Sequence, residues 1–277
     1  MDSCPMYFPE NFDLKEVVFL NKLVNTAYDM YSQWIAQGKP KEKKFNWLPK
    51  SPAGSPHLRY SDPIWGEDKK FFGIFETAEP FAFIAYDDSD NTVYLVFRGT
   101  ESASDWLENL KFEQTDYSLV SGYGKVHKGF FSIYKTMSSA IHKCLEEVST
   151  PKKLYITGHS LGSSLSILSV PDIITNTSYK ADLPVINYNL ASPRTGDPIF
   201  ASAYNSNGVS TYRVVNTCDI VPTVPLSVVS SELDSPIYKH VGIPVDFTAQ
   251  YNSIEGNHSA KDSYLYALEH PQEPSDS

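Results

Sequence analysis

One short segment of this sequence carries the residue types of a nucleophilic centre. In Gly158-His159-Ser160-Leu161-Gly162 a serine stands between two glycines, the G-x-S-x-G pattern in which a strand turns sharply into a helix and presents the hydroxyl at its tip. The flanks agree, because residues 154–157 resemble a short buried strand and residues 161–170 a helix lined with small side chains. An ordinary glycine turn carrying a surface serine would not need these flanks. The pattern predicts that Ser160 is a nucleophile of acyl transfer.

A serine hydroxyl is a poor nucleophile at neutral pH and needs a histidine to accept its proton. With this motif the chain order is serine, acid, histidine, which leaves His240, His258 and His270 as candidates. His270 lies in a polar, proline-rich tail, and His240 falls within an expected strand at 238–245, where a core or edge role is favoured. His258 follows a glycine-asparagine turn and is expected to open a helix, so we predict that it is the base.

The histidine needs a carboxylate that orients it and stabilises its cation. Chain order allows six aspartates: Asp172, Asp182, Asp197, Asp219, Asp234 and Asp246. Asp219 alone follows directly on a strongly β-type strand, at residues 211–216, and is therefore the predicted acid. Asp197 is better explained as a helix cap after Gly196, and the other four as turn or surface residues.

A tetrahedral oxyanion needs two hydrogen-bond donors. The first is expected from the backbone N–H of Leu161, which follows the nucleophile, and the second from the loop after an earlier strand. Thr100, in Phe97-Arg98-Gly99-Thr100, stands at such a place. The alternative reading of this segment is simply a strand that ends in a glycine turn.

The elements that must position these residues alternate between strands and helices. A helix is expected at about 14–37, preceded by a possible capping box of Asp13 with Glu16, and a hairpin is expected over 80–97. Further along, we expect helices at 130–148 and from about 161, and strands at 154–157, 185–190 and 211–216. This alternation predicts an α/β fold with a largely parallel sheet covered on both faces, in which function gathers at the carboxyl ends of the strands.

Length and charge limit the partners. The 277 residues show no internal repeat and no linker, so we expect a single domain over 1–277. The formal charge of −10 argues against nucleic acid, which needs a basic surface. No apolar run approaches the roughly 20 residues that span a bilayer, so no transmembrane segment is expected.

Nothing in the chain suggests a metal site or fixes a compartment. The sequence begins without a secretory signal, so the chain is either cytoplasmic or secreted with its signal peptide removed. Cys4, Cys144 and Cys218 are widely spaced, and three ordinary thiols are favoured over a disulfide framework or zinc ligands. The predicted chemistry also needs neither metal nor organic cofactor.

Several segments together resemble the class 3 lipases, the fungal-lipase-like branch of the α/β-hydrolases. They run in the family's order across residues 80–268 and include, besides the nucleophile motif, Val96-Phe97-Arg98-Gly99-Thr100 with Asp105-Trp106, His127-Lys128-Gly129-Phe130, Ala191-Ser192-Pro193-Arg194-Thr195-Gly196 and Asn216-Thr217-Cys218-Asp219-Ile220-Val221-Pro222. Two features depart from the family: Ser163 replaces a usual glycine, and the cysteines of disulfide-bearing secreted members are missing.

The resemblance implies the same residues as the chemical argument. It makes Ser160 the nucleophile, Asp219 the acid and His258 the base, and it implies an oxyanion hole of Thr100 and Leu161. His127 and Arg194 become framework residues near the site, and residues 101–112 become a lid over it.

The segment at 101–112 is amphipathic when written as a helix. Ala103, Trp106, Leu107 and Leu110 share one face, with charged residues on the other. A surface helix packed on the core would show the same pattern. As a lid, the helix would turn this face towards lipid, and its moderate apolarity predicts modest interfacial activation.

The expected function is a serine carboxylester hydrolase that cleaves lipid (acylglycerol) esters at a transient lipid–water interface. Two alternatives stay open. One is an esterase for soluble aromatic or short-chain esters, similar to a feruloyl esterase. The other is a lipase-like protein without catalysis that binds a ligand, because fold does not fix function.

Overall fold

The computed structural model describes residues 6–55, 57–67, 78–179, 183–227 and 237–271. Within these ranges one large sheet is built from β1 (Leu58–Tyr60), β2 (Ile64–Gly66), β3 (Glu79–Asp87), β4 (Thr92–Phe97), β7 (Lys153–His159), β8 (Val185–Leu190), β9 (Ser210–Asn216) and β10 (Ile243–Phe247). A small separate ribbon pairs β5 (Gln114–Asp116) with β6 (Lys125–His127). The helices are α1 (Leu14–Ala36), α2 (Ala103–Asn109), α3 (Lys128–Glu146), α4 (Leu161–Asn176), α5 (Pro198–Asn205), α6 (Ile254–His258) and α7 (Tyr266–Glu269), with short turns η1 (Glu42–Lys44), η2 (Val221–Thr223) and η3 (Ala260–Leu265).

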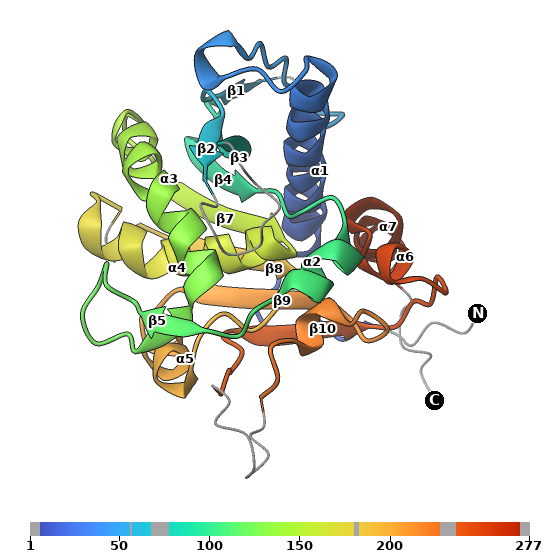
Figure 1. Cartoon of the computed structure of the whole chain (residues 1–277). Helices are drawn as coiled ribbons and strands as arrows, with labels where there is room; N and C mark the ends of the chain where they lie inside the picture. The colour runs from blue at the N-terminus through green and yellow to red at the C-terminus, as the bar shows by residue number, and fades with distance from the viewer. Residues whose placement is uncertain (1–5, 56, 68–77, 180–182, 228–236, 272–277) are drawn as a thin grey trace.

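The sheet is mostly parallel (Figure 1). Its order is β1-β3-β4-β7-β8-β9-β10, with β2 also paired to β3. The pairs from β4 to β10 are parallel, whereas β1, β2 and β4 run antiparallel to β3. Register places Phe97 opposite Gly158 and Gly158 opposite Asn189. The chain that leaves β4, β7 and β8 therefore emerges at one edge of the sheet, as the sequence predicted for its chemical residues.

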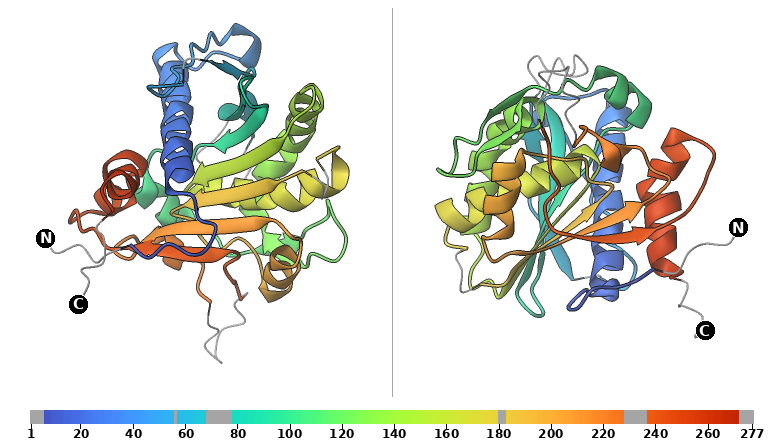
Figure 2. Two further views of the ribbon diagram at one scale, coloured as in Figure 1. Left: turned by 180° about the vertical axis from the view of Figure 1, so that it is seen from behind. Right: turned by 90° about the horizontal axis from the view of Figure 1, so that it is seen from below.

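Helices cover both faces of this sheet, as the two views of Figure 2 show. The α1 helix lies on one face, and it begins where the sequence predicted because Asp13 accepts a hydrogen bond from the N–H of Glu16. Its buried residues pack with Phe83, Val96 and Tyr155 of the strands in one hydrophobic core. Each fully buried aliphatic side chain contributes about 1.5–3 kcal/mol, which anchors α1 to the sheet.

The α3 and α4 helices lie on the opposite face with a second core. Four buried serines of α4 make it narrow, which lets it approach the strands closely: Ser163, Ser164, Ser166 and Ser169. The predicted helices at 130–148 and from about 161 are confirmed, as are the hairpin and the strands at 154–157, 185–190 and 211–216.

One predicted strand begins in the wrong place. The expected strand at 238–245 is irregular at its start, where Lys239 makes only an isolated bridge to Gly196, and β10 runs instead over Ile243–Phe247. Gly242, with φ of 72°, separates the two parts, because a left-handed residue interrupts an extended strand. His240 therefore lies outside the sheet.

Candidate active site

The nucleophile motif forms a strained turn between β7 and α4. Ser160 has φ of 58° and ψ of −127°, a conformation that costs a non-glycine residue of order 1–3 kcal/mol and persists only where surrounding structure enforces it. A Cβ on Gly158 would come within 2.3 Å of the Gly162 oxygen, and a Cβ on Gly162 within 2.5 Å of the Arg98 oxygen. Both glycines are therefore required by close backbone packing, as the motif predicts.

Ser163 helps to hold this turn. Its Oγ donates towards the carbonyl oxygens of Gly158 and Leu190, each at 2.7 Å, and accepts from the N–H of Leu190 at 3.2 Å. It thus ties the elbow to the adjacent strand β8. The residue that departs from the family's usual glycine is an additional hydrogen-bonded support here.

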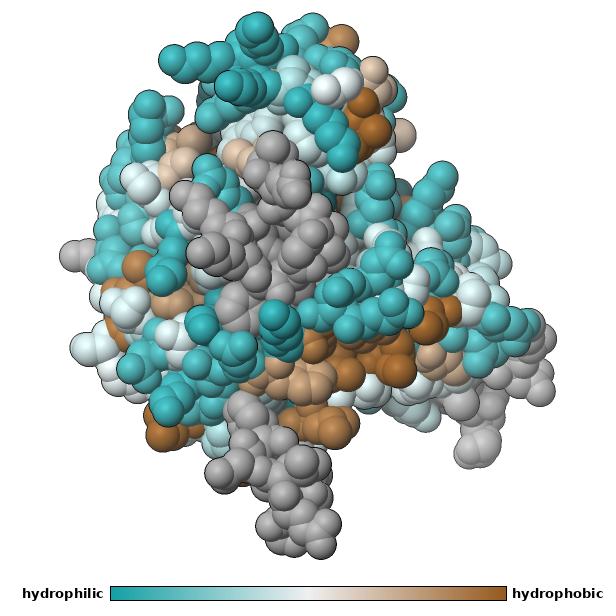
Figure 3. Space-filling view, in the orientation of Figure 1, coloured by the Kyte–Doolittle hydropathy of each residue, from teal (hydrophilic) through white to brown (hydrophobic). Residues whose placement is uncertain are grey.

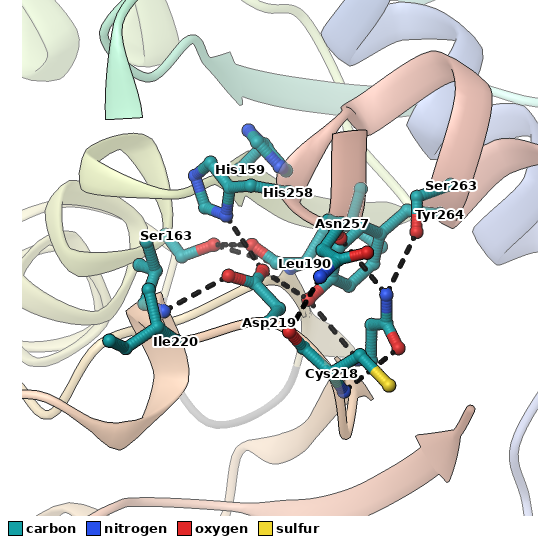
Figure 4. Close-up of polar contacts among 12 residues, drawn as sticks. His159, Ser163, Leu190, Cys218, Asp219, Ile220, Asn257, His258, Ser263 and Tyr264 are labelled. Atoms are coloured by element: carbon teal, nitrogen blue, oxygen red, sulfur yellow. Dashed lines mark hydrogen bonds and ion pairs between the residues drawn. The ribbon is translucent and has the colours of Figure 1, made fainter. Parts of the chain in front are cut away.

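Asp219 lies just beyond β9, where the sequence placed it, and its carboxylate is almost completely buried. Oδ2 is 2.7 Å from His258 Nδ1 and accepts from the Tyr264 hydroxyl at 2.8 Å, while Oδ1 accepts from the Val221 N–H at 3.0 Å. Figure 4 shows this arrangement, with the His258 ring standing over the carboxylate. Three donors fix the orientation of the acid, and through it the orientation of the histidine.

His258 closes the short helix α6 instead of opening one, which corrects the expected local structure. The next residue, Ser259, is the cap of η3, so the histidine lies at a junction of two helical segments. Its Nε2 is buried and has no hydrogen-bond partner among the described residues, and the same holds for the Ser160 Oγ. An acid-bound imidazole whose second nitrogen is uncommitted can accept a proton, as the predicted role of His258 as a general base requires.

Sequence reasoning missed two residues that back this histidine. The His159 ring packs against the His258 ring with centroids 4.5 Å apart, and its Nδ1 is 2.8 Å from the Tyr28 hydroxyl. The same hydroxyl accepts the Gly99 N–H at 3.2 Å. Tyr28 therefore joins helix α1 to both the nucleophile turn and the loop after β4. No local motif marks Tyr28, because it lies 131 positions from His159.

His159 is held in its neutral form. Burial, and then the neighbouring His258, lower the pKa of His159 well below its usual value. Burial also raises the pKa of Tyr28, so its hydroxyl keeps its proton. Because the Tyr28 oxygen already accepts from Gly99, it can donate that proton to the unprotonated Nδ1. His159 thus places no second positive charge beside His258.

The residues predicted to supply the oxyanion donors lie on either side of Ser160 along the chain and in space. Leu161 is the first residue of α4, so its N–H is one of those with no acceptor within the helix. On the other side, a Cβ on Gly99 would lie 2.8 Å from the Ser160 Cβ, which places the Gly99-Thr100 backbone directly beside the serine. The Thr100 Oγ1 is buried and has no partner among the described residues.

Arg98 fixes the loop that carries Thr100. It is buried, and its guanidinium donates to the Gly99 and Pro80 carbonyls and to Glu79 Oε2, each at 2.8 Å. The Cζ atom of its guanidinium lies 3.9 Å from the ring centroid of Tyr31. A charged group that is buried with all these partners is costly to move, so Arg98 makes the loop that carries Thr100 rigid.

The α2 segment lies over this region with its apolar face inward. Trp106 is fully buried and stacks on Phe130, and Ala103 and Leu110 are also buried, while Leu107 is partly so. The Ser104 hydroxyl donates to Glu255 at 2.6 Å, which links α2 to helix α6. Figure 3 shows apolar side chains gathered on the face where α2 lies in Figure 1.

Other candidate residues have structural roles. His240 Nε2 lies 2.8 Å from the Pro222 oxygen, and Arg194 donates to the carbonyls of Thr223 and Pro225, so both hold the loop that follows Asp219. Burial, and then Arg213, lower the pKa of His240 to about 3. His127 caps α3.

The remaining aspartates divide as follows. Asp197 caps α5, as predicted. The expectation that Asp172 is a turn or surface residue is wrong, because it is completely buried within α4. Asp246 is an exposed residue of β10, and Asp182 and Asp234 lie outside the described residues.

The described ranges contain no group of three His, Cys, Asp or Glu side chains that could hold a metal ion. No helix within them is long and apolar enough to cross a membrane. Cys144 and Cys218 are free thiols, and Cys4 lies outside the described residues.

The comparisons with known proteins give matches to lipases and a phospholipase. The family model described as lipase (class 3) matches residues 94–229. A lipase of Rhizomucor miehei is 35% identical over 57% of this chain and 45% of its own length. A phospholipase A1-II of Oryza sativa subsp. japonica is 34% identical over 64% of this chain and 47% of its own. The chain thus spans less than half of the length of these curated relatives.

The structural likeness extends further than the sequence likeness. A solved triacylglyceride lipase of Rhizomucor miehei superposes with a TM-score of 0.62 at 25% identity, covering 87% of this chain and 82% of that one. The parallel sheet with helices on both faces is therefore the α/β-hydrolase fold of the fungal lipases.

Proposed function

Since this chain belongs to the class 3 lipase family, we propose that it is a serine carboxylester hydrolase that cleaves lipid (acylglycerol) esters. One observation carries the proposal. The imidazole of His258 is bound to Asp219, has a free, buried Nε2, and packs on His159, the residue before Ser160, whose hydroxyl is also free. The named activities of the fungal relatives point to the same reaction.

In the first half of the reaction Ser160 attacks the ester carbonyl while His258 Nε2 takes its proton. The negative charge that develops on the carbonyl oxygen is met by the N–H groups of Leu161 and Thr100. The intermediate collapses when the histidine gives the proton to the leaving alcohol. Ser160 is left acylated, and the alcohol departs with the proton.

In the second half water replaces the alcohol. His258 removes a proton from the water as it attacks the acyl-enzyme, and then returns a proton to Ser160 as the acid is released. The Asp219 carboxylate stabilises the transient imidazolium. No step requires a metal or an organic cofactor.

The α2 helix is the proposed lid. Trp106 of α2 and Leu110, which follows the helix, have buried side chains. A long acyl chain can therefore reach this apolar surface only if α2 moves. Exposing this face to water costs about 25 cal/mol per Å², and contact with a lipid surface offsets that cost. Interfacial activation should be modest, because Asp105 and Glu108 keep the helix only moderately apolar.

Two assays on the purified protein test the hydrolase assignment. A fluorophosphonate should label Ser160 alone, and p-nitrophenyl esters of increasing acyl length should all be hydrolysed. Emulsified triacylglycerol and a phosphatidylcholine then separate the two activities named among the relatives. Labelling of another residue would show that Ser160 is not the nucleophile, and no hydrolysis of any ester would leave the protein as a lipase-like binding protein.

Trp106→Ala tests the lid. Activity on emulsified long-chain esters should fall about tenfold, and activity on dissolved short-chain esters clearly less, because only long chains need the apolar surface. Rates on both substrates, with the unfolding midpoint as a control for folding, make the measurement. Equal losses on both would make Trp106 a packing residue and favour a soluble esterase.

A further inference from the structure

A hollow adjoins the candidate active site on the side of helix α1. It has a volume of about 350 Å³ and lies between α1, the segment after β4, and the α6–η3 junction, with Thr100 and His258 among its lining residues. We call it the side pocket. Its wall also includes Asn25 and Tyr28 from α1, and Glu255 and Lys261 from the C-terminal segment.

The position of the side pocket assigns it to one part of an ester. His258 must stand close to the leaving oxygen to protonate it, so the alcohol portion extends towards the histidine. The side pocket is lined by that histidine, by its neighbour Ser259 and by the oxyanion residue Thr100. None of the apolar side chains of Trp106, Leu110 and Val221 lines the side pocket, and all three belong to the same buried core. We assign the acyl portion to that apolar side.

The lining of the side pocket offers hydrogen bonds of both kinds. The Asn25 amide nitrogen is held by the Asn21 carbonyl, which leaves the amide oxygen as an acceptor. Glu101 and Glu255 supply carboxylates, and Lys261 supplies an ammonium that makes no ion pair with the described residues. A bare alkyl chain offers these groups no hydrogen bond in place of water, which costs about 1–3 kcal/mol for each group that it buries.

The volume and the charge of the side pocket further limit the ligands that it can bind. At about 30 Å³ per water molecule, the volume holds on the order of ten water-sized groups, which suits glycerol or a single sugar. Two carboxylates against one ammonium, in a chain of charge −10, disfavour an anionic headgroup. Hydroxyl groups can donate to the carboxylates and accept from Lys261.

We propose that the side pocket binds the leaving alcohol of the substrate, and that this alcohol is a small neutral polyol such as glycerol with free hydroxyls or a sugar. The assignment rests on the proposed hydrolase function. The preferred ester therefore has one acyl chain on a hydroxyl-rich headgroup, and a monoacylglycerol is its simplest form.

The same pocket should choose between acceptors when the acyl-enzyme forms from any ester. An acceptor hydroxyl attacks the acyl carbonyl and gives its proton to His258, which passes it to the released Ser160, so a new ester forms without net hydrolysis. With ethyl octanoate as donor and equal concentrations of glycerol and 1-propanol, we expect the glycerol ester to exceed the propyl ester at least fivefold. Asn25→Leu and Lys261→Leu should each lower this product ratio threefold or more.

Lys125→Leu is the matched control, since this lysine is exposed on β6 and lies outside the pocket. Direct hydrolysis supplies the second readout, which is the ratio of kcat/KM for 1-octanoylglycerol to kcat/KM for ethyl octanoate.

A product ratio near one, or ratios that Asn25→Leu and Lys261→Leu leave unchanged, would overturn the pocket assignment while the hydrolase proposal stands. Faster cleavage of dioctanoylphosphatidylcholine than of 1-octanoylglycerol would overturn the neutral polyol. Absence of any ester cleavage and of fluorophosphonate labelling would instead remove the hydrolase proposal itself.

Discussion

The described part of the chain contains two aspartate–histidine pairs, one at the candidate active site and one between helices α3 and α4. Asp219 is 2.7 Å from His258 Nδ1, and Asp172 is 2.9 Å from His142 Nε2. Both carboxylates are completely or almost completely buried. Judged by distance and burial alone, the two pairs are nearly equivalent.

The two pairs differ in the other groups that surround each carboxylate and each imidazole. Asp172 accepts from His142, the hydroxyls of Tyr134 and Ser138, and the Asn176 amide. Burial alone would raise its pKa, but these donors together lower it below the usual value. The four donors come from α3 and from the end of α4, so the cluster joins the two helices.

The decisive difference lies on the far side of each imidazole. His258 presents a buried, uncommitted Nε2 at the nucleophile turn, whereas the His142 side chain is 26% exposed and meets no strained serine. A buried Asp–His pair is therefore insufficient evidence for catalysis. We expect the catalytic type to have an uncommitted second nitrogen close to a serine on strained backbone.

Removing the nucleophile should give the largest effect of all. If Ser160 is the partner that makes the Asp219 pair catalytic, Ser160→Ala should lower kcat about a million-fold, as in serine proteases. Single-turnover hydrolysis of a p-nitrophenyl ester measures it. Substantial turnover by the alanine variant would end the distinction between the pairs.

Mutation of Asp219 should impair catalysis, whereas mutation of Asp172 should impair stability. Asp219→Asn keeps the shape but misorients the histidine, and should lower kcat about 10⁴-fold with little change in stability. His258→Ala should be similarly damaging, with His240→Ala as the matched histidine control. If His240→Ala abolished activity and His258→Ala did not, the base would be misassigned.

Asp172→Ala should affect stability instead of chemistry. It leaves the Tyr134 and Ser138 hydroxyls without their acceptor, so the free energy of unfolding should fall by about 3 kcal/mol. Urea unfolding monitored by tryptophan fluorescence measures this change. Activity per folded molecule should stay within about twofold of the wild type, and a loss as large as that of Asp219→Asn would contradict a purely structural pair.

The smallest effect should be a pH dependence of stability at His142. The hydrogen bond to Asp172 raises the pKa of His142 above its usual value of 6.5, although burial partly opposes it. A raised folded pKa stabilises the protein fully below pH 6.5, and this stabilisation is lost as pH rises through the folded pKa. Because the side chain is partly exposed, it should be less than about 1 kcal/mol.

His142→Gln isolates the pH-dependent contribution of His142 to the free energy of unfolding. The difference in unfolding free energy between wild type and variant should be largest near pH 6 and should shrink as pH rises above the folded pKa. Urea unfolding at a series of pH values checks it. A difference that grows with pH would show that the neutral imidazole is the stabilising form.

The sequence by itself determined the parts that depend on neighbours along the chain. The turn around Ser160 follows from two glycines between an apolar strand and a small-residue helix, and α1 begins at its capping aspartate. The place of Asp219 after β9 could be predicted because it follows a recognisable strand, and parallel strands end at one edge. Periodicity, capping and backbone strain are local, so a local reading recovers them.

Only the tertiary structure decided the contacts between distant segments. Tyr28 reaches His159, and Tyr264 reaches Asp219, across 131 and 45 positions, and no spacing rule in the chain encodes such pairs. Asp172 was misjudged for the same reason, since its acceptor role exists only when α3 packs against α4. A buried polar group keeps its place only where distant partners satisfy it, and those partners meet only when the sheet and both helical layers have assembled.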